Sequence, residues 1–364
     1  MEKKKKISQG EMINRENLGK SLVASRELKK GHIIQEEDIK ILSPGQGLSP
    51  QMFDKLVGKQ LNRDMQFEDY FFKSDIDNLV HKSKKYNFKL KWGVPVRYHD
   101  YKEYQQLITP DLFEFHLSYS DMELNIQDFI NTESKSGFVV HAPELFKGSN
   151  LMDLASPDKK YRDKSIEETQ SVIEITKELN KFFPNQKNPL IVANIGGFSM
   201  DKPLDSRYKN DYYNRFSESL SQLATDGVEL IPQTMAPFPW HFGGQRYQNL
   251  FVLPEEIVEK CNLMNLRICL DVSHSMLTCN HFNINFYEFI EKVAPFTAHI
   301  HMGDAKGVNG EGLQIGEGDI DFIRLCKILK DNASEASFIP EIWQGHKNSG
   351  EGFWIALDRL NGLL

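Results

Sequence analysis

The sequence of 364 residues lacks most of the features that mark membrane, secreted or nucleic-acid-binding proteins. It has no run of about 18 apolar residues, so we expect no membrane-spanning helix. No apolar stretch follows the positively charged N-terminus, so we expect no secretory signal. The only basic run is Lys3–Lys6 and the formal net charge is −7. Because phosphate binding needs concentrated Lys and Arg, we expect neither nucleic acid nor a membrane as a partner.

Cysteine is also scarce. The four cysteines form no Cys-x-x-Cys pair, so no cysteine-ligated zinc site or disulfide framework is indicated. Cys269 lies within an apolar stretch, where a thiol is typical of a small core residue. These absences predict a reduced, cytoplasmic protein. The 40% hydrophobic and 26% charged residues that are present are typical of a globular protein with a sizeable core.

Residues 15–76 are predicted to form a compact, β-rich module. Short apolar segments alternate there with turn signals. SLVASREL, which begins at Ser21, is typical of a strand, and SPGQGLSP at residues 43–50 is typical of a loop. A core of this size would be only marginally stable alone.

The words KSLVA, LKKGHIIQEEDI, SPGQGLSP, LVGKQLNRD and SDI follow one another in this module. In this order they resemble the SAF (antifreeze-like) domain that ends bacterial sialic acid synthases. The resemblance implies a role with sialic-type (nonulosonic) acids or their N-acyl sugar precursors, and it implies a sialic acid synthase barrel as a possible partner. In the synthases an Arg in an Arg-Pro-Gly loop reaches the substrate of a neighbouring subunit. Ser43 stands at that position here, so this sugar contact does not carry over. A homodimer is a further expectation.

Residues 77–89 are charged and lack an apolar period, so we predict a linker there. From residue 90 to 364, short apolar strands alternate with amphipathic stretches at helical spacing. We expect strands near residues 91–98, 112–119, 137–143, 190–197, 228–235, 267–274, 298–304 and 337–343. Eight strand–helix units over this length predict an α/β fold, a (β/α)₈ TIM barrel.

Polar residues follow nearly every expected strand, at the end of a TIM barrel that carries the active site. They are His141, Asn194, Gln233, Asp271, His301 and Glu341. Any one of them could be structural, and Asp271 could simply cap the next helix with His274 beneath it. Together they favour a site. Gln233, Asp271, His301 and Glu341 offer nitrogen and oxygen ligands without a thiolate, which suits one divalent ion such as Mn²⁺, Mg²⁺, Co²⁺ or Zn²⁺.

HAPELF, LASPDKKYRDKSIEET, CLDVSH and HMGDAKG with IGEGDIDF resemble words of endonuclease IV. That enzyme belongs to the xylose-isomerase-like superfamily, which also holds sugar isomerases and epimerases. The resemblance implies that the shared metal ligands are Gln233, in place of a Glu, Asp271, His301 and Glu341. His141 matches a ligand of the first zinc, but its companion His is Asn194. His274 matches a ligand of the third zinc, but EGLQ at residues 311–314 replaces an Asp-x-His motif. The three-zinc set is therefore incomplete, and an abasic-site endonuclease is the least favoured reading.

The resemblance implies a metal-dependent sugar isomerase or epimerase, which moves a proton beside a carbonyl through an enediolate. Members use a pair of Glu residues, of which only Glu341 remains, because Gln233 cannot transfer a proton. We expect Glu144 or His274 to be the second proton carrier. We expect substrate contacts from His141, Asn194, Trp240, His241, Arg246 and His116. A packed lid explains the loop residues of this set equally well, and barrel filling explains His116 equally well.

A second hypothesis comes from a different class of function. The protein would be a non-catalytic partner subunit that supplies its SAF domain to a sialic acid synthase lacking one.

Overall fold

The computed structural model describes residues 9–241 and 244–364. The chain divides into two compact units. Unit 1 consists of the residues up to Lys82 together with His346–Trp354, and unit 2 of Ser83–Gly345 with Ile355–Leu364.

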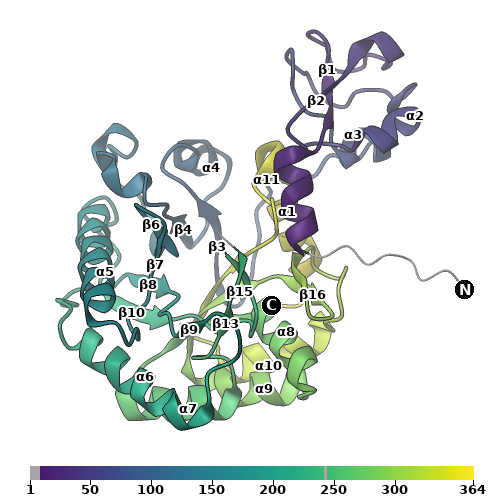
Figure 1. Cartoon of the computed structure of the whole chain (residues 1–364). Helices are drawn as coiled ribbons and strands as arrows, with labels where there is room; N and C mark the ends of the chain where they lie inside the picture. The colour runs from purple at the N-terminus through teal and green to yellow at the C-terminus, as the bar shows by residue number, and fades with distance from the viewer. Residues whose placement is uncertain (1–8, 242–243) are drawn as a thin grey trace, which may run out of the picture. The chain divides into compact units, whose positions relative to one another are not determined.

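Unit 1 is small and rich in turns (Figure 1, purple to blue). Its elements are α1 (Gln9–Leu18), β1 (Ser21–Ala24), β2 (Ile39–Leu42), α2 (Phe53–Leu56) and α3 (Lys73–Asp77). β1 pairs antiparallel with β2, and isolated bridges such as Leu28–Met65 join the loops. Leu22, Leu56 and Phe71 are buried in one apolar cluster. The small N-terminal domain expected from the sequence is therefore present.

The segment His346–Trp354 completes unit 1. The Nζ atom of Lys347 lies 3.1 Å from Oε1 of Glu16 in α1. Asn348 and Ser349 have positive φ angles, so the start of α11 (Lys347–Leu360) is interrupted by left-handed backbone. The indole of Trp354 donates a hydrogen bond of 2.8 Å to the Ser349 carbonyl and fixes this turn.

Unit 2 is a parallel eight-stranded barrel. Its strands are β3 (Lys91–Val96), β4 (Leu112–His116), β5 (Gly137–His141), β8 (Leu190–Ala193), β10 (Glu229–Pro232), β14 (Ile268–Asp271), β15 (Thr297–Met302) and β18 (Ser337–Pro340). They pair in the order β10-β8-β5-β4-β3-β18-β15-β14. A parallel bridge between Gln233 and Cys269 joins the two end strands. The TIM barrel predicted from the sequence is confirmed. Every expected range overlaps one barrel strand, and β15 begins one residue before its range.

Helices surround the barrel (Figure 1). They are α4 (Tyr101–Leu107), α5 (Lys159–Asn180), α6 (Ser206–Leu220), α7 (Pro254–Met264), α8 (Val272–Phe282), α9 (Phe286–Val293), α10 (Phe322–Asn332) and α11. The sequence explains the longest of them, α5. Asp158 caps its first turn by accepting hydrogen bonds from the N–H groups of Lys160 and Tyr161. Ser165, Thr169, Val172, Thr176 and Leu179 then recur at intervals of three and four residues and form its buried face.

The loops at the barrel's rim carry short strands. They are β6 (Leu145–Phe146), β7 (Asn150–Leu151), β9 (Phe198–Ser199), β11 (Trp240–His241), β12 (Gly244–Gln245), β13 (Tyr247–Gln248), β16 (Asp304–Lys306) and β17 (Gly310–Leu313). Apolar side chains, among them Val192, Ile231, Cys269 and Ile339, form a buried cluster contributed by the barrel strands. Cys269 is thus the small core residue that the sequence indicated. None of the helices in the described ranges combines the length and apolar character needed to cross a lipid bilayer.

Candidate functional site

Asp271 ends β14 and serves two purposes with its two oxygens. Oδ1 accepts a hydrogen bond of 2.8 Å from the His274 N–H and caps α8. Oδ2 lies 2.9 Å from Nε2 of Gln233 and 3.8 Å from Nδ1 of His301. Burial raises the pKa of Asp271, but the charges of His274 and His301 have the larger combined effect. The pKa of Asp271 is therefore below its usual range. Asp271 therefore caps α8 with one oxygen while the other faces Gln233 and His301, and the carboxylate stays charged.

His141, His301 and Glu341 bring their ligand atoms together beside Asp271. One ring nitrogen of each histidine and one oxygen of Glu341 all lie within 4.8 Å of one another. Nδ1 of His301 is 2.9 Å from Oε2 of Glu341. Imidazole nitrogens and carboxylate oxygens without a thiolate suit a borderline or hard divalent ion. The residues present therefore fit a single metal ion.

Gln233 lies between these groups. Its Nε2 atom is 2.9 Å from Asp271 Oδ2 and 3.2 Å from His301 Nδ1, and its Oε1 atom is 3.3 Å from Nε2 of His141. Rotating the amide by 180° exchanges its oxygen and nitrogen, and it would place the oxygen beside Asp271 and His301. Gln233 can thus offer an oxygen to an ion, and its role as a metal ligand stays a prediction.

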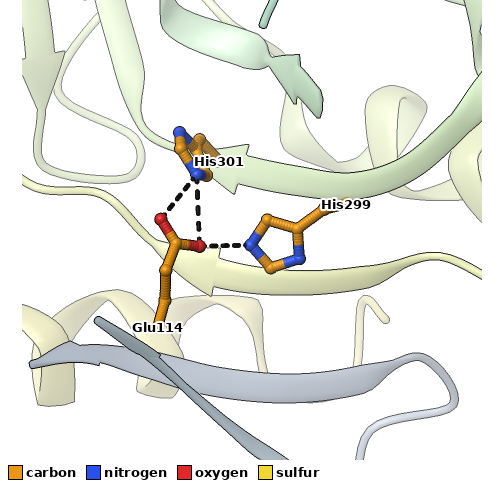
Figure 2. Close-up of side chains that lie close together, drawn as sticks. All are labelled: Glu114, His299 and His301. Atoms are coloured by element: carbon orange, nitrogen blue, oxygen red, sulfur yellow. Dashed lines mark hydrogen bonds and ion pairs between the residues drawn. The ribbon is translucent and has the colours of Figure 1, made fainter. Parts of the chain in front are cut away.

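A buried carboxylate supports His301 from the other side (Figure 2). Oε1 of Glu114, on β4, lies 3.0 Å from Nε2 of His301. Its Oε2 lies 2.5 Å from Nε2 of His299, which like His301 is on β15. All three side chains have no exposed surface. Burial raises the pKa of Glu114, but the charges of His301 and His299 have the larger combined effect. The pKa of Glu114 is therefore well below its usual value.

Glu114 orients His301 for the site. Because Nε2 of His301 donates to a carboxylate, the ring is fixed with Nδ1 facing Glu341 and Asp271. Glu114, His299 and His301 also have ligand atoms close enough to hold an ion. Their burial and mutual hydrogen bonds favour a support for His301 instead.

The sequence reading missed Glu114 and His299, although a signal was available. Side chains two residues apart point to the same face of a strand. Glu114 therefore points with His116 into the barrel, and His299 points with His301. A charged residue in the middle of a buried strand needs a partner, and another such strand could supply it.

A polar cavity of about 180 Å³ opens beside the candidate metal ligands. It is lined by His141, Glu144, Gln233, Met235, Pro239, His274, Glu311 and Glu341. Both expected proton carriers, Glu144 and His274, are thus in its wall. Asn194 stands behind Glu144 and donates to its Oε1 at 3.4 Å. His116 stacks on His141, with 4.9 Å between the ring centres, and its Nε2 lies 2.8 Å from Glu114.

His274 is held by acceptors on both ring nitrogens. Nδ1 lies 3.0 Å from the Thr234 carbonyl oxygen, and Nε2 lies 3.0 Å from Oε1 of Glu311. Burial lowers the pKa of His274, but the charges of Asp271 and Glu311 outweigh burial and raise it to about 10. The ring is therefore an imidazolium at neutral pH. Glu311, from the EGLQ stretch, was not among the expected site residues.

The remaining expected residues lie in the loop after β10. The Arg246 N–H is 3.4 Å from the carbonyl of Pro239, a cavity residue. The side chains of Trp240 and His241 fall outside the part of the chain that the structure describes.

Models of known protein families match both parts of the chain. A family model described as xylose isomerase-like TIM barrel matches residues 103–358, and one described as SAF domain matches residues 19–76. A stretch of 56 residues is 41% identical to pseudaminic acid synthase of Campylobacter jejuni subsp. jejuni (serotype O:23/36, strain 81-176). It covers 15% of this chain and 16% of the synthase, so the chain spans about a sixth of that relative.

Solved structures share the barrel. A D-tagatose 3-epimerase-like protein superimposes with a TM-score of 0.52 at 23% identity, over 74% of this chain and 95% of that one. Mannonate dehydratase from Streptococcus suis serotype 2 gives a TM-score of 0.50 at 16% identity, over 75% and 93% of the chains. Identities this low establish the fold alone. With the family match spanning most of the chain, this protein belongs to the xylose isomerase-like TIM barrel family and carries an N-terminal SAF domain.

Proposed function

We propose that the barrel is a metal-dependent sugar isomerase or epimerase that acts on a sialic-type acid or an N-acyl sugar precursor. The observation that carries the proposal is the convergence of His141, His301 and Glu341 within 4.8 Å on the wall of a polar cavity. Asp271 and Gln233 adjoin the same atoms.

Asp271, His301 and Glu341, with Gln233 or a water molecule, would hold one divalent ion, and His141 beside them would contact the substrate. When bound, such an ion stabilises the negative charge that develops on a sugar oxygen as a neighbouring carbon loses its proton. Glu114 keeps His301 in the orientation that binding requires. Because Gln233 stands in place of a Glu, the site has one acidic group fewer.

Glu341 and Glu144 are the groups able to move a proton at a sugar carbon. Both are carboxylates in the cavity wall. Glu341 is about a third exposed, with a side-chain accessibility of 34%. Asn194 orients Glu144 through its Oε1 atom. The sequence left His274 as an alternative carrier. Because both of its ring N–H groups already donate to acceptors, Thr234 and Glu311, it has no free nitrogen to accept a proton, and it could only give one up.

The sialic-type substrate rests on the SAF domain and its 41% identity to a pseudaminic acid synthase over 56 residues. This support comes from association with a neighbouring domain and not from the geometry of the cavity.

The experiment is an exchange assay on chelator-treated protein reloaded with Mn²⁺ or Co²⁺. N-acyl hexosamines and nonulosonic acids are incubated in D₂O, and loss of the carbon-bound proton is followed by NMR. We expect metal-dependent exchange with at least one sugar, and Glu341→Gln should abolish it. Glu144→Gln should slow it by about 10²–10⁴-fold, the usual contribution of a general acid or base. His274→Asn should leave the metal bound and slow exchange. Parental rates in both Glu144→Gln and His274→Asn would refute the acid–base scheme.

The synthase likeness supports a second candidate, a non-catalytic partner subunit. This candidate predicts stoichiometric co-purification with a synthase that lacks its own SAF domain, and no exchange with any sugar in the metal-loaded protein.

A further inference from the structure

Three carboxylates line the polar cavity, and one of them, Glu311, has no part in the proposed metal site or proton transfer. The other two are Glu144 and Glu341. Because Glu341 is expected to bind the ion, Glu144 and Glu311 are the carboxylates left to face a substrate. Oε1 of Glu311 lies 3.0 Å from Nε2 of His274, and the side chain of Glu311 has an accessibility of 23%. Glu311 is therefore a wall residue with contact to both His274 and the cavity.

The backbone beside Glu311 is fixed on two sides. Glu311 lies on β17, which pairs antiparallel with β16. The N–H of the next residue, Gly312, donates a bond of 2.9 Å to Oγ of Ser273 in α8. The Gly312 carbonyl accepts a bond of 2.7 Å from the N–H of Trp343, which follows β18. Gly312 has a φ of +62°, and a Cβ there would lie 3.3 Å from the Trp343 nitrogen, so this position suits glycine. These bonds hold Glu311 at the cavity.

Glu144 and Glu311 come from opposite sides of the barrel. Glu144 follows β5, and Glu311 belongs to the hairpin that follows β15. In the strand order β5 is third and β15 is seventh, so they are 7 − 3 = 4 places apart, halfway round a closed barrel of eight strands. A sugar bound in the cavity would therefore lie between these two carboxylates.

Negative charge dominates the groups that face a substrate. The two charges of a divalent ion would be balanced by those of Asp271 and Glu341. Of the remaining charged groups in the wall, Glu144 and Glu311 outnumber His274 even when its ring is counted as a cation, since 2 − 1 = 1. Among the described residues, the lining of the cavity includes no Lys or Arg. A carboxylate accepts hydrogen bonds from hydroxyl and amide N–H groups, whereas it repels a second anion placed a few ångströms away.

We infer that Glu311 is a specificity-determining residue, which makes the barrel accept neutral N-acyl sugars and disfavour sugar acids and sugar phosphates. The inference rests on the proposed function, because it requires that the cavity binds a sugar. It decides between the two substrate classes of that proposal, in favour of the N-acyl sugar precursor over the sialic-type acid. A fixed like charge that opposes the wrong ligand is a general source of specificity.

The test is calorimetric titration of the full chain, loaded with Mn²⁺, with two sugars at low ionic strength. N-acetyl-D-mannosamine is the neutral sugar and N-acetylneuraminate is the acid. We expect the parent to bind the neutral sugar about 10-fold or more tightly than the acid. Glu311→Gln should raise the affinity for the acid by about 10-fold and so remove most of this preference. The amide oxygen of Gln can still accept the hydrogen bond from His274, so we expect this variant to fold.

Glu317→Gln is the matched control. Glu317 lies just after β17, its side chain has an accessibility of 55%, and it pairs with Arg359 at 3.3 Å. This variant changes the net charge of the chain by the same amount, but Glu317 is not in the lining of the cavity. It should keep the parental preference. Should Glu311→Gln fail to fold, Glu311→Thr takes its place, because it removes the charge and keeps a hydroxyl acceptor for His274.

Each outcome has a defined meaning. A parent that binds the acid as tightly as the neutral sugar, or binds neither, overturns the inference. An unchanged preference in Glu311→Gln overturns it as well, and so does an equal change in Glu317→Gln, which would indicate an effect of net charge alone. Binding of the neutral sugar without exchange of a carbon-bound proton would refute the proposed function and leave the charge preference standing. Metal-dependent exchange of the acid, with none of the neutral sugar, would support the proposed function and refute the role of Glu311.

Discussion

Glu114→Gln is the most informative single change, because it alters the support of the metal site without touching the cavity. The carboxylate has no exposed surface, and it lies 3.0 Å from His301 Nε2 and 2.5 Å from His299 Nε2. Gln has the same size but only one acceptor oxygen. Nε2 of His116 also lies 2.8 Å from this carboxylate. At least one of the histidine N–H groups would therefore face an amide N–H₂ group, which cannot accept its hydrogen bond.

Two magnitudes follow. Removing one partner of a buried ionic pair costs about 3–5 kcal/mol of unfolding free energy, because the other charge is left uncompensated. Loss of the hydrogen bond that orients a metal-binding histidine typically lowers metal affinity by about 10–100-fold. We therefore expect Glu114→Gln to lose both stability and affinity, although it removes none of the expected ligands Gln233, Asp271, His301 and Glu341.

The assay is calorimetric titration of chelator-treated protein with Mn²⁺, together with denaturant unfolding of the same sample. Asp75→Asn is the matched control. Asp75 is also fully buried and accepts bonds of 3.2 and 3.1 Å from Arg63, but it belongs to unit 1. It should lose stability and keep the parental metal affinity.

Unchanged Mn²⁺ affinity in a folded Glu114→Gln protein would refute the role of Glu114 in orienting His301. A parent that binds two ions, with one lost in Glu114→Gln, would show instead that Glu114, His299 and His301 form a metal site of their own.

Four further predictions can be checked independently. Elemental analysis should find one divalent ion per chain, and Asp271→Asn should lower its affinity; two or three ions would favour a nuclease-like site. Gln233→Glu should still bind metal and retain turnover, measured by solvent exchange, because it restores a carboxylate without removing a ligand. Limited proteolysis should cut first within residues 77–89 and leave a soluble barrel; first cleavage elsewhere would contradict the predicted linker. Burial raises the pKa of Asp38, but hydrogen bonds, led by that from His32, bring it below its usual 3.8. The resulting stabilisation is present above about pH 4 and is lost as the pH falls through the lowered pKa. Amide hydrogen exchange in residues 19–76 of the parent should therefore become faster at this low pH, and the increase should be smaller in Asp38→Asn.

The sequence by itself determined the barrel and the positions of its candidate ligands. Each strand is a short apolar run that can be recognised from its own residues, without information from distant parts of the chain. Because parallel strands of a barrel end on one face, polar residues at strand ends such as Asp271, His301 and Glu341 had to converge.

Only the tertiary structure decided which partners support them. Glu114 and His301 are 187 positions apart, and their contact depends on barrel closure and on the inward register of β4 and β15. In unit 1, the segment His346–Trp354 packs with α1 from the other end of the chain, through the ion pair of Lys347 with Glu16. Such contacts leave no periodic signal in the sequence, because they depend on three-dimensional proximity and not on local spacing.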